Sequence, residues 1–171
     1  MVIAIIIVIL LILALFTKKE YTIERDVIIN KPTLQVFNYI KFLKNQDYYN
    51  KWVMMDPKAK KEYKGTDGTV GFVSAWDSDN KNVGKGEQEI KKINEGEKMD
   101  LEIRFSKPFE GKADAYLLTE SISQNQTKIK WGFTSGMKYP MNIMLLFIDI
   151  PKMLGNDLQT SLTNLKNVLE K

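Results

Sequence analysis

Neither cysteine nor histidine occurs among the 171 residues of this sequence. Without cysteine the chain can form no disulfide bond and carry out no thiolate chemistry. Without histidine it lacks the commonest general base and the commonest ligand of zinc and iron. These absences exclude a serine–histidine–aspartate mechanism and the usual transition-metal sites. We therefore predict no metal site and no cofactor, and the sequence assigns no catalytic residue.

Arginine is also scarce. Lysine and arginine together number 25 against 21 acidic residues, which gives a net charge of +4, but only two of the 25 are arginine. Proteins that read nucleic acids usually carry arginine clusters beside aromatic residues, and the sequence has no such cluster. We expect no nucleic-acid partner, and we interpret the excess of lysine as a solvated surface.

The N-terminus is an unbroken apolar run over residues 1–16, followed directly by Lys18 and Lys19. A helix over residues 1–17 would span about 25 Å, slightly less than a hydrocarbon core of about 30 Å. No basic residue precedes the run, and residues 14–16 are a poor cleavage site, which disfavours a signal peptide. A run that is apolar all round also does not suit an amphipathic core helix. We predict a transmembrane anchor over residues 1–17.

The charges that follow the apolar run predict its orientation. Lys18, Lys19, Arg25 and Lys31 all lie on its C-terminal side, so the positive-inside rule places the remainder of the chain in the cytoplasm. Residues 20–171 have the length of one domain. We expect a single-pass protein of the cell membrane with this domain on the cytoplasmic side. The sequence does not determine the oligomeric state.

Alternating hydrophobicity dominates the domain. Residues 21–29 read as a strand, and Pro32 then introduces two short helical segments, over residues 34–43 and 46–52. Turn residues separate six further predicted strands, over residues 60–64, 70–76, 86–91, 99–105, 113–123 and 128–133. Strands with this alternation have one buried and one wet face, and consecutive hairpins form an antiparallel sheet.

A long helix closes the chain. Leu154, Leu158, Leu162, Leu165 and Leu169 recur at helical spacing, after residues near 149–151 that suit a helix start. Residues 141–148 are a second apolar stretch, either a separate helical turn or the first part of one kinked helix. The predicted fold class is α+β, with a curved antiparallel sheet of about seven strands wrapped around the C-terminal helix.

Three segments carry a family resemblance. They are residues 25–32 (RDVIINKP), with Val36, Phe37 and Trp52 beyond them, residues 127–131 (TKIKW) and residues 155–166 (GNDLQTSLTNLK). With the element order, residues 21–171 resemble the helix-grip fold of the SRPBCC superfamily, which includes START lipid-transfer domains, plant proteins of the birch-pollen-allergen type and polyketide cyclase/dehydrase-like proteins. The resemblance implies a cavity between sheet and long helix that holds an apolar or amphipathic molecule. These motifs are fold signatures and none is catalytic.

Strand register and this resemblance together nominate ligand-binding residues. Adaptable methionines and aromatic residues with a few polar groups are typical of ligand cavities. The residues expected to face the cavity are Phe72, Ser74, Trp76, Gln88, Leu101, Ile103, Trp131 and Phe133 from the strands, and Met141, Met144, Leu145, Met153 and Leu154 from the segments opposite. Ordinary core is the alternative for each residue taken singly.

Polar residues on the strands need separate interpretations. Gln88 and Ser74 face inward, and a buried amide must find hydrogen-bond partners. Glu102 and Arg104 should lie on the solvated outer face. Arg25 is expected at the surface near the anchor.

We weigh three functions. The leading hypothesis is a membrane-tethered domain that binds a lipid or another apolar small molecule. The second is a polyketide cyclase/dehydrase-like enzyme, which would need Asp114, Tyr116 or Glu120 as an inward acid or base. The third is a non-catalytic protein-interaction or regulatory module with a filled core.

Overall fold

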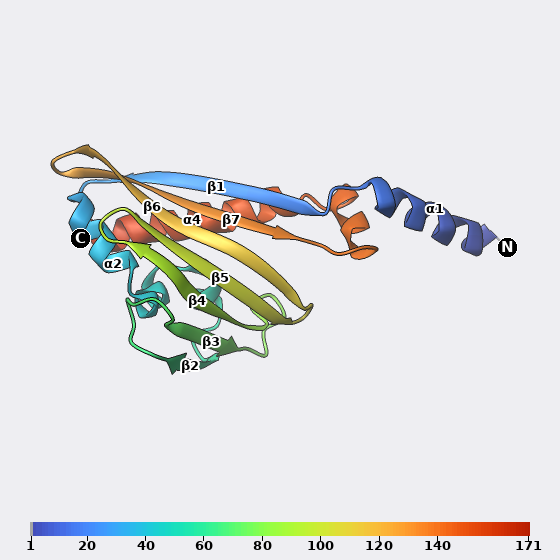
Figure 1. Cartoon of the computed structure of the whole chain (residues 1–171), viewed down its shortest axis with the longest axis horizontal. Helices are drawn as coiled ribbons and strands as arrows, with labels where there is room; N and C mark the ends of the chain where they lie inside the picture. The colour runs from blue at the N-terminus through green and yellow to red at the C-terminus, as the bar shows by residue number, and fades with distance from the viewer. Residues whose placement is uncertain (1) are drawn as a thin grey trace.

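The computed structural model describes residues 2–171, so Met1 of the predicted anchor lies outside the described residues. A helix, α1 (Val2–Phe16), projects from one end of an α+β domain (Figure 1). At the opposite end lie helix α2 and the C-terminus of the chain. The cavity described below extends toward the end that carries α1.

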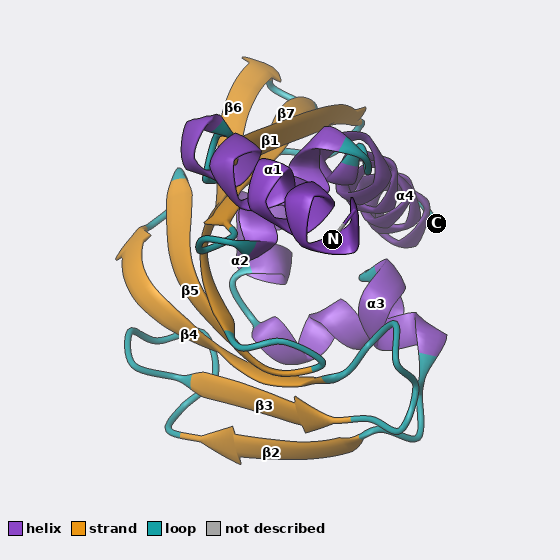
Figure 2. Ribbon diagram, turned by 90° about the vertical axis from the view of Figure 1, so that its right-hand side faces the viewer, coloured by secondary structure: helices purple, strands orange, loops and turns teal. Residues whose placement is uncertain are grey.

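Seven antiparallel strands form one sheet in the order β1-β7-β6-β5-β4-β3-β2. Their bounds are β1 (Glu20–Ile29), β2 (Lys60–Lys64), β3 (Val73–Asp77), β4 (Lys85–Asn94), β5 (Lys98–Lys107), β6 (Gly111–Ser123) and β7 (Gln126–Gly136). The number of strands and their hairpin order confirm the sequence prediction. Only β1 joins the sheet from a distance, because it pairs with β7 and places the first strand beside the last. The sheet curves around the helices (Figure 2).

Three short helices connect β1 to β2, where the sequence predicted two. They are α2 (Thr33–Ile40), the 3-10 helix η1 (Leu43–Tyr48) and α3 (Lys51–Met55). Phe42 has an extended backbone, with φ −86° and ψ 109°, and separates α2 from η1. Asn50 is extended too, and its side chain accepts a hydrogen bond from the Trp52 amide at 3.0 Å, which caps α3. A predicted helix over residues 46–52 is therefore divided by its own capping residue.

The last two helices are separate. The 3-10 helix η2 covers Met141–Leu146, and the long helix α4 covers Ile150–Leu169. Asp149 caps α4 by accepting a hydrogen bond from the Lys152 amide at 3.0 Å, and Pro151 occupies the first turn. Residues 141–148 are thus a separate turn and not the start of one kinked helix.

A solid core fills the end of the domain that α2 covers, which we call the closed end. Val36, Phe37 and Ile40 of α2 are fully buried. They belong to one buried cluster with residues of the sheet and of α4, namely Ile29, Leu117, Ile129, Leu162 and Leu165. The leucine spacing that predicted α4 is therefore the spacing of its buried face.

Helix α4 packs closely against β1 at Gly155. A Cβ atom at this position would lie 2.3 Å from Nη2 of Arg25, so only glycine admits the guanidinium. Arg25 is consequently half-buried between β1 and α4. The expectation that this residue lies at the surface was wrong, because the inward register of β1 extends through it.

The apolar helix α1 has almost no partner in the domain. Its valine, isoleucine, leucine and phenylalanine side chains are exposed, whereas Ala14 is buried at the junction with η2. Within residues 2–171, no helix is both long and apolar enough to cross a membrane.

Candidate ligand-binding cavity

A cavity of about 920 Å³ lies between the concave face of the sheet and the helices opposite it. Its walls come from the sheet, chiefly β3 to β7, on one side and from η1, α3, η2 and the first half of α4 on the other. Figure 2 views this end of the domain with α1 pointing toward the reader. The volume falls in the range of small-molecule sites, roughly 300–1,000 Å³.

Ten of the thirteen nominated residues lie in the wall of this cavity. They are Ser74, Trp76, Gln88, Leu101, Ile103, Trp131, Phe133, Met141, Met144 and Leu154. Strand register explains most of them, because alternate residues of each strand face the same side of the sheet. The structure thus brings together side chains from four strands, η2 and α4.

Phe72, Leu145 and Met153 lie outside the wall. Phe72 precedes β3 and is fully buried in the core, where its ring stacks on Tyr63 with centroids 6.1 Å apart. Leu145 is half-buried on η2. Met153 is 53% exposed, because it lies about 100° around the helix from its neighbour Leu154, which does face the cavity.

The wall formed by η1 and α3 was missed at the sequence level. Leu43, Gln46, Asn50 and Val53 all line the cavity. Their spacing of three, four and three residues is helical and could have indicated a common face. The two polar members obscured the pattern, since polar residues ordinarily mark the solvated side of a helix.

Three side-chain amides form a buried polar cluster in the wall. Gln46 and Gln88 exchange hydrogen bonds, with Nε2 to Oε1 distances of 3.0 and 3.3 Å. Nδ2 of Asn50 donates to Oε1 of Gln46 at 2.9 Å, while Oδ1 of Asn50 caps α3. The partner that Gln88 requires therefore comes from η1. Each amide nitrogen has two hydrogens, so the cluster retains donor capacity toward the cavity.

Aromatic side chains make up much of the remaining wall. The indole Nε1 of Trp76 donates to the Val83 carbonyl at 3.2 Å, and its ring meets Phe105 edge to face with centroids 6.3 Å apart. Trp131 meets Tyr49 edge to face at 6.2 Å. Burial raises the pKa of the Tyr49 hydroxyl well above its usual range, so this group stays neutral.

The residues required by an enzymatic reading do not lie together inside the cavity. Tyr116 and Glu120 are on the outward face of β6, and neither belongs to the wall. Tyr116 covers Gly132 and donates a hydrogen bond to Glu24, which raises the pKa of its hydroxyl to about 12. Asp114 lies at the cavity edge, with a carboxylate oxygen 4.0 Å from Nζ of Lys112. The enzymatic hypothesis needs one of these three groups to point inward, but the small residues Ala113 and Ala115 occupy the buried positions of β6.

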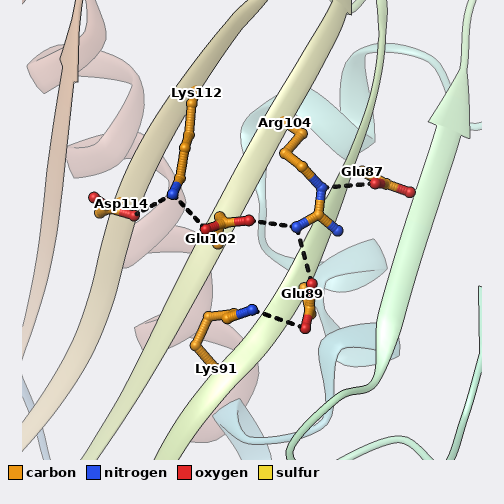
Figure 3. A network of polar contacts seen from close by, with 7 residues as sticks. All are labelled: Glu87, Glu89, Lys91, Glu102, Arg104, Lys112 and Asp114. Atoms are coloured by element: carbon orange, nitrogen blue, oxygen red, sulfur yellow. Dashed lines mark hydrogen bonds and ion pairs between the residues drawn. The ribbon is translucent and has the colours of Figure 1, made fainter.

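The outer face of the sheet carries a network of ion pairs centred on Arg104 (Figure 3). Its Nε lies 2.7 Å from Glu87, and its Nη1 lies 2.9 Å from Glu89 and also contacts Glu102. These carboxylates hold the pKa of Arg104 above its ordinary value. Lys112 and Arg104 hold the pKa of Glu102 below its ordinary value. The outward position expected for Glu102 and Arg104 agrees with this arrangement, which faces away from the cavity.

No group of three or more acidic side chains in residues 2–171 is placed to hold a metal ion. The cavity wall is mainly apolar and aromatic, its polar members include the amide cluster, and exposed charged residues such as Lys107 and Glu110 also belong to it.

Solved structures provide the comparison, since no family model and no curated protein matches the sequence. Truncated norcoclaurine synthase from Thalictrum flavum aligns with a TM-score of 0.67 and 12% identity, over 89% of this chain and 95% of that one. Ara h 8.0201 aligns at 0.58 and 16% identity, over 88% and 97%. The Aha1 protein of Colwellia psychrerythraea, solved as a dimer, aligns at 0.55 and 12% identity, over 88% and 96%.

These likenesses show that the chain has the helix-grip fold of Bet v 1-like and SRPBCC proteins. The fold class predicted from the sequence is confirmed. At such low identity the likeness concerns the fold alone, and function must be argued from the cavity.

Proposed function

We propose that this protein binds a lipid or another apolar or amphipathic small molecule in the cavity between the sheet and α4, at a membrane reached through residues 1–17. The observation that carries the proposal is the open volume of about 920 Å³ beneath α4, with walls formed mainly by apolar and aromatic side chains. A core of this size left empty would forgo much packing energy, whereas a bound apolar molecule restores those contacts.

The amide cluster favours an amphipathic ligand. Gln46, Asn50 and Gln88 are buried and uncharged, so they suit a carbonyl, hydroxyl or amide of the ligand better than an ionised group. Among similar folds, norcoclaurine synthase has been solved in complex with dopamine and hydroxybenzaldehyde, with a TM-score of 0.64 and 13% identity to this chain. A small molecule with an apolar body and a polar end is the ligand class that we propose here.

Membrane attachment is the second part of the proposal. The exposed aliphatic side chains of α1 would be hydrated in water, and burying them in a bilayer removes that cost. Lys18 and Lys19 follow the helix, and with Arg25 and Lys31 they favour placing the domain on the cytoplasmic side of the cell membrane. The attachment would hold the cavity close to a reservoir of apolar molecules.

The alternatives receive less support. A cyclase-like enzyme needs an acid or base that reaches the substrate, and Tyr116 and Glu120 lie on the other face of the sheet. An interaction module with a filled core does not account for the open volume beside Trp76 and Trp131.

The test is ligand binding by the full chain in mild detergent. Native mass spectrometry should reveal a copurified apolar molecule, and a fluorescent fatty-acid analogue should bind saturably. Ser74→Trp fills the cavity and should abolish this binding, whereas Ser123→Trp, at the exposed end of β6, should leave it unchanged. Absence of any binding by the unaltered chain would refute the proposal.

Orientation has its own test, because the sequence contains no cysteine. A single Leu34→Cys substitution on the exposed face of α2 should react with a membrane-impermeant maleimide only after cells are opened. Labelling of intact cells would place the domain outside.

A further inference from the structure

Six exposed apolar side chains lie on two segments at the end of the domain from which α1 projects. We call them the apolar lip, and they are Phe109, Tyr139, Met141, Leu146, Phe147 and Ile148. Phe147 is 71% exposed and Phe109 is 64% exposed. They belong to the β5–β6 loop and to the stretch around η2, both of which lie toward α1 (Figure 1). An exposed apolar group of this size normally marks a binding surface.

The apolar lip also borders the cavity. Phe109, Tyr139 and Met141 contribute to the cavity wall while remaining largely exposed to solvent. A molecule that enters or leaves at this end therefore passes the lip. The medium or partner that covers the lip is therefore the one from which a ligand enters the cavity.

Hydrogen bonds join the end of α1 to the part of the lip around η2. The buried side chain of Asn142 in η2 donates hydrogen bonds to the carbonyls of Ala14, at 2.7 Å, and Thr17, at 3.0 Å. The Met137 amide donates to the Lys19 carbonyl at 2.8 Å. These carbonyls lie at and just beyond the end of α1, and a polar side chain buried for this purpose fixes η2 against the helix. These bonds hold η2, which carries Met141 and Leu146 of the lip, beside the end of α1.

Basic side chains accompany the lip. Lys18, Lys19, Lys107, Lys138 and Lys152 are exposed, and within residues 2–171 none of them forms an ion pair. Three acidic residues, Glu20, Glu110 and Asp149, lie on the same segments, so the five lysines leave an excess of positive charge. Apolar side chains among unpaired lysines are typical of surfaces that meet anionic lipid.

From these observations we infer that the apolar lip inserts into the headgroup region of an anionic bilayer, so that the cavity exchanges its ligand directly with the membrane. The inference rests on the proposed function and deepens it, because it names the bilayer itself as the partner of the cavity mouth. Attachment through α1 alone would not hold the domain against the surface of the bilayer. The hydrogen bonds of Asn142 instead hold the η2 part of the lip beside the end of α1, and thus close to the lipid.

The test places a single nitroxide-quenchable fluorophore on the cysteine-free chain, at Phe147→Cys or at Leu34→Cys. Leu34 is a matched control, because it is an apolar residue 61% exposed on α2 at the opposite end. Each labelled full-length chain is reconstituted into phosphatidylcholine and phosphatidylglycerol vesicles that carry spin-labelled lipid. We expect quenching at position 147 to exceed that at position 34 severalfold, and to weaken in vesicles of phosphatidylcholine alone.

Equal quenching at the two positions, in chains that float with the vesicles, overturns the inference. So does disulfide formation between two unlabelled Phe147→Cys chains when the labelled chain shows no lipid quenching, which would show that a second copy covers the lip. The proposed function is scored separately, by binding of the fluorescent fatty-acid analogue in detergent. Phe147→Asp should keep that binding, since Phe147 is not part of the cavity wall. The same substitution should slow uptake of the analogue from vesicles severalfold.

Discussion

The closed end and the cavity-bearing end of the domain lie beneath the same sheet and the same helix, yet they are filled differently. At the closed end, Phe37 and Ile40 of α2 enter the space between the sheet and Leu162 of α4. At the other end no comparable side chain enters, and α3 contributes no fully buried residue. Helix α2 therefore fills the space beneath the sheet at one end, whereas α3 leaves a cavity at the other. Stability should reside in the first region and binding in the second.

Truncation at the closed end should have the largest effect on stability. Phe37→Ala removes a fully buried ring from a solid core and should lower the free energy of unfolding by about 3–5 kcal/mol. Phe133→Ala, in the cavity wall, removes a ring that already borders open space and should cost less than half as much. Urea unfolding of the full chain in mild detergent measures both. Equal losses would mean that the cavity is as tightly packed as the closed end.

Enlarging a side chain should reduce stability at the closed end and reduce ligand binding in the cavity. Ile40→Trp overfills the closed end and should destabilise the fold by about 1–3 kcal/mol. Ile103→Trp projects into the cavity and should leave stability unchanged while it weakens ligand binding at least tenfold. Thermal unfolding and a titration with the fluorescent fatty-acid analogue separate the two outcomes. A destabilised Ile103→Trp variant with intact binding would contradict the assignment of this wall.

The amide cluster should contribute both to stability and to ligand binding. Gln88→Leu leaves Nε2 of Gln46 without its partner in a buried place and should cost about 1–3 kcal/mol of stability. It should also weaken binding of ligands that have a polar end more than binding of pure hydrocarbons. The double variant Gln46→Leu/Gln88→Leu should lose less stability than the sum of the two single variants. Strict additivity would show that the two amides act independently.

The smallest effect should come from the outer face. Arg104 and Lys91 lower the pKa of Glu89, and Lys112 and Arg104 lower that of Glu102, relative to the ordinary value of 4.5. A lowered carboxyl pKa contributes stability above 4.5 that is lost as pH falls through the folded-state value. Arg104→Met should therefore flatten the loss of stability between neutral and acidic pH, while ligand binding at neutral pH stays unchanged. An unaltered pH profile would show that these pairs contribute nothing, as is common at exposed sites.

The helix-grip order of elements and ten of the thirteen nominated wall residues could be predicted because strand alternation and leucine spacing repeat along the chain. Local patterns failed where the backbone departs from repetition. Phe72 was misplaced because the turn before β3 ends only at Gly71, and residue 73 is the first of the strand. Gln46 and Asn50 were missed because polar residues ordinarily mark the solvated side of a helix, and Gln88, the partner of Gln46, lies on a strand that meets η1 only after folding.

The sequence by itself determined the α+β class, the hairpin order, the buried face of α4 and the apolar character of residues 1–16. Each follows from the periodicity of side chains along a single element, which the chain specifies locally. Only the tertiary structure decided that the closed end is solid and the other end hollow, and that Asn142 joins η2 to α1. Those outcomes depend on which side chains from distant segments share one space, and no periodicity along the chain encodes a volume left unfilled.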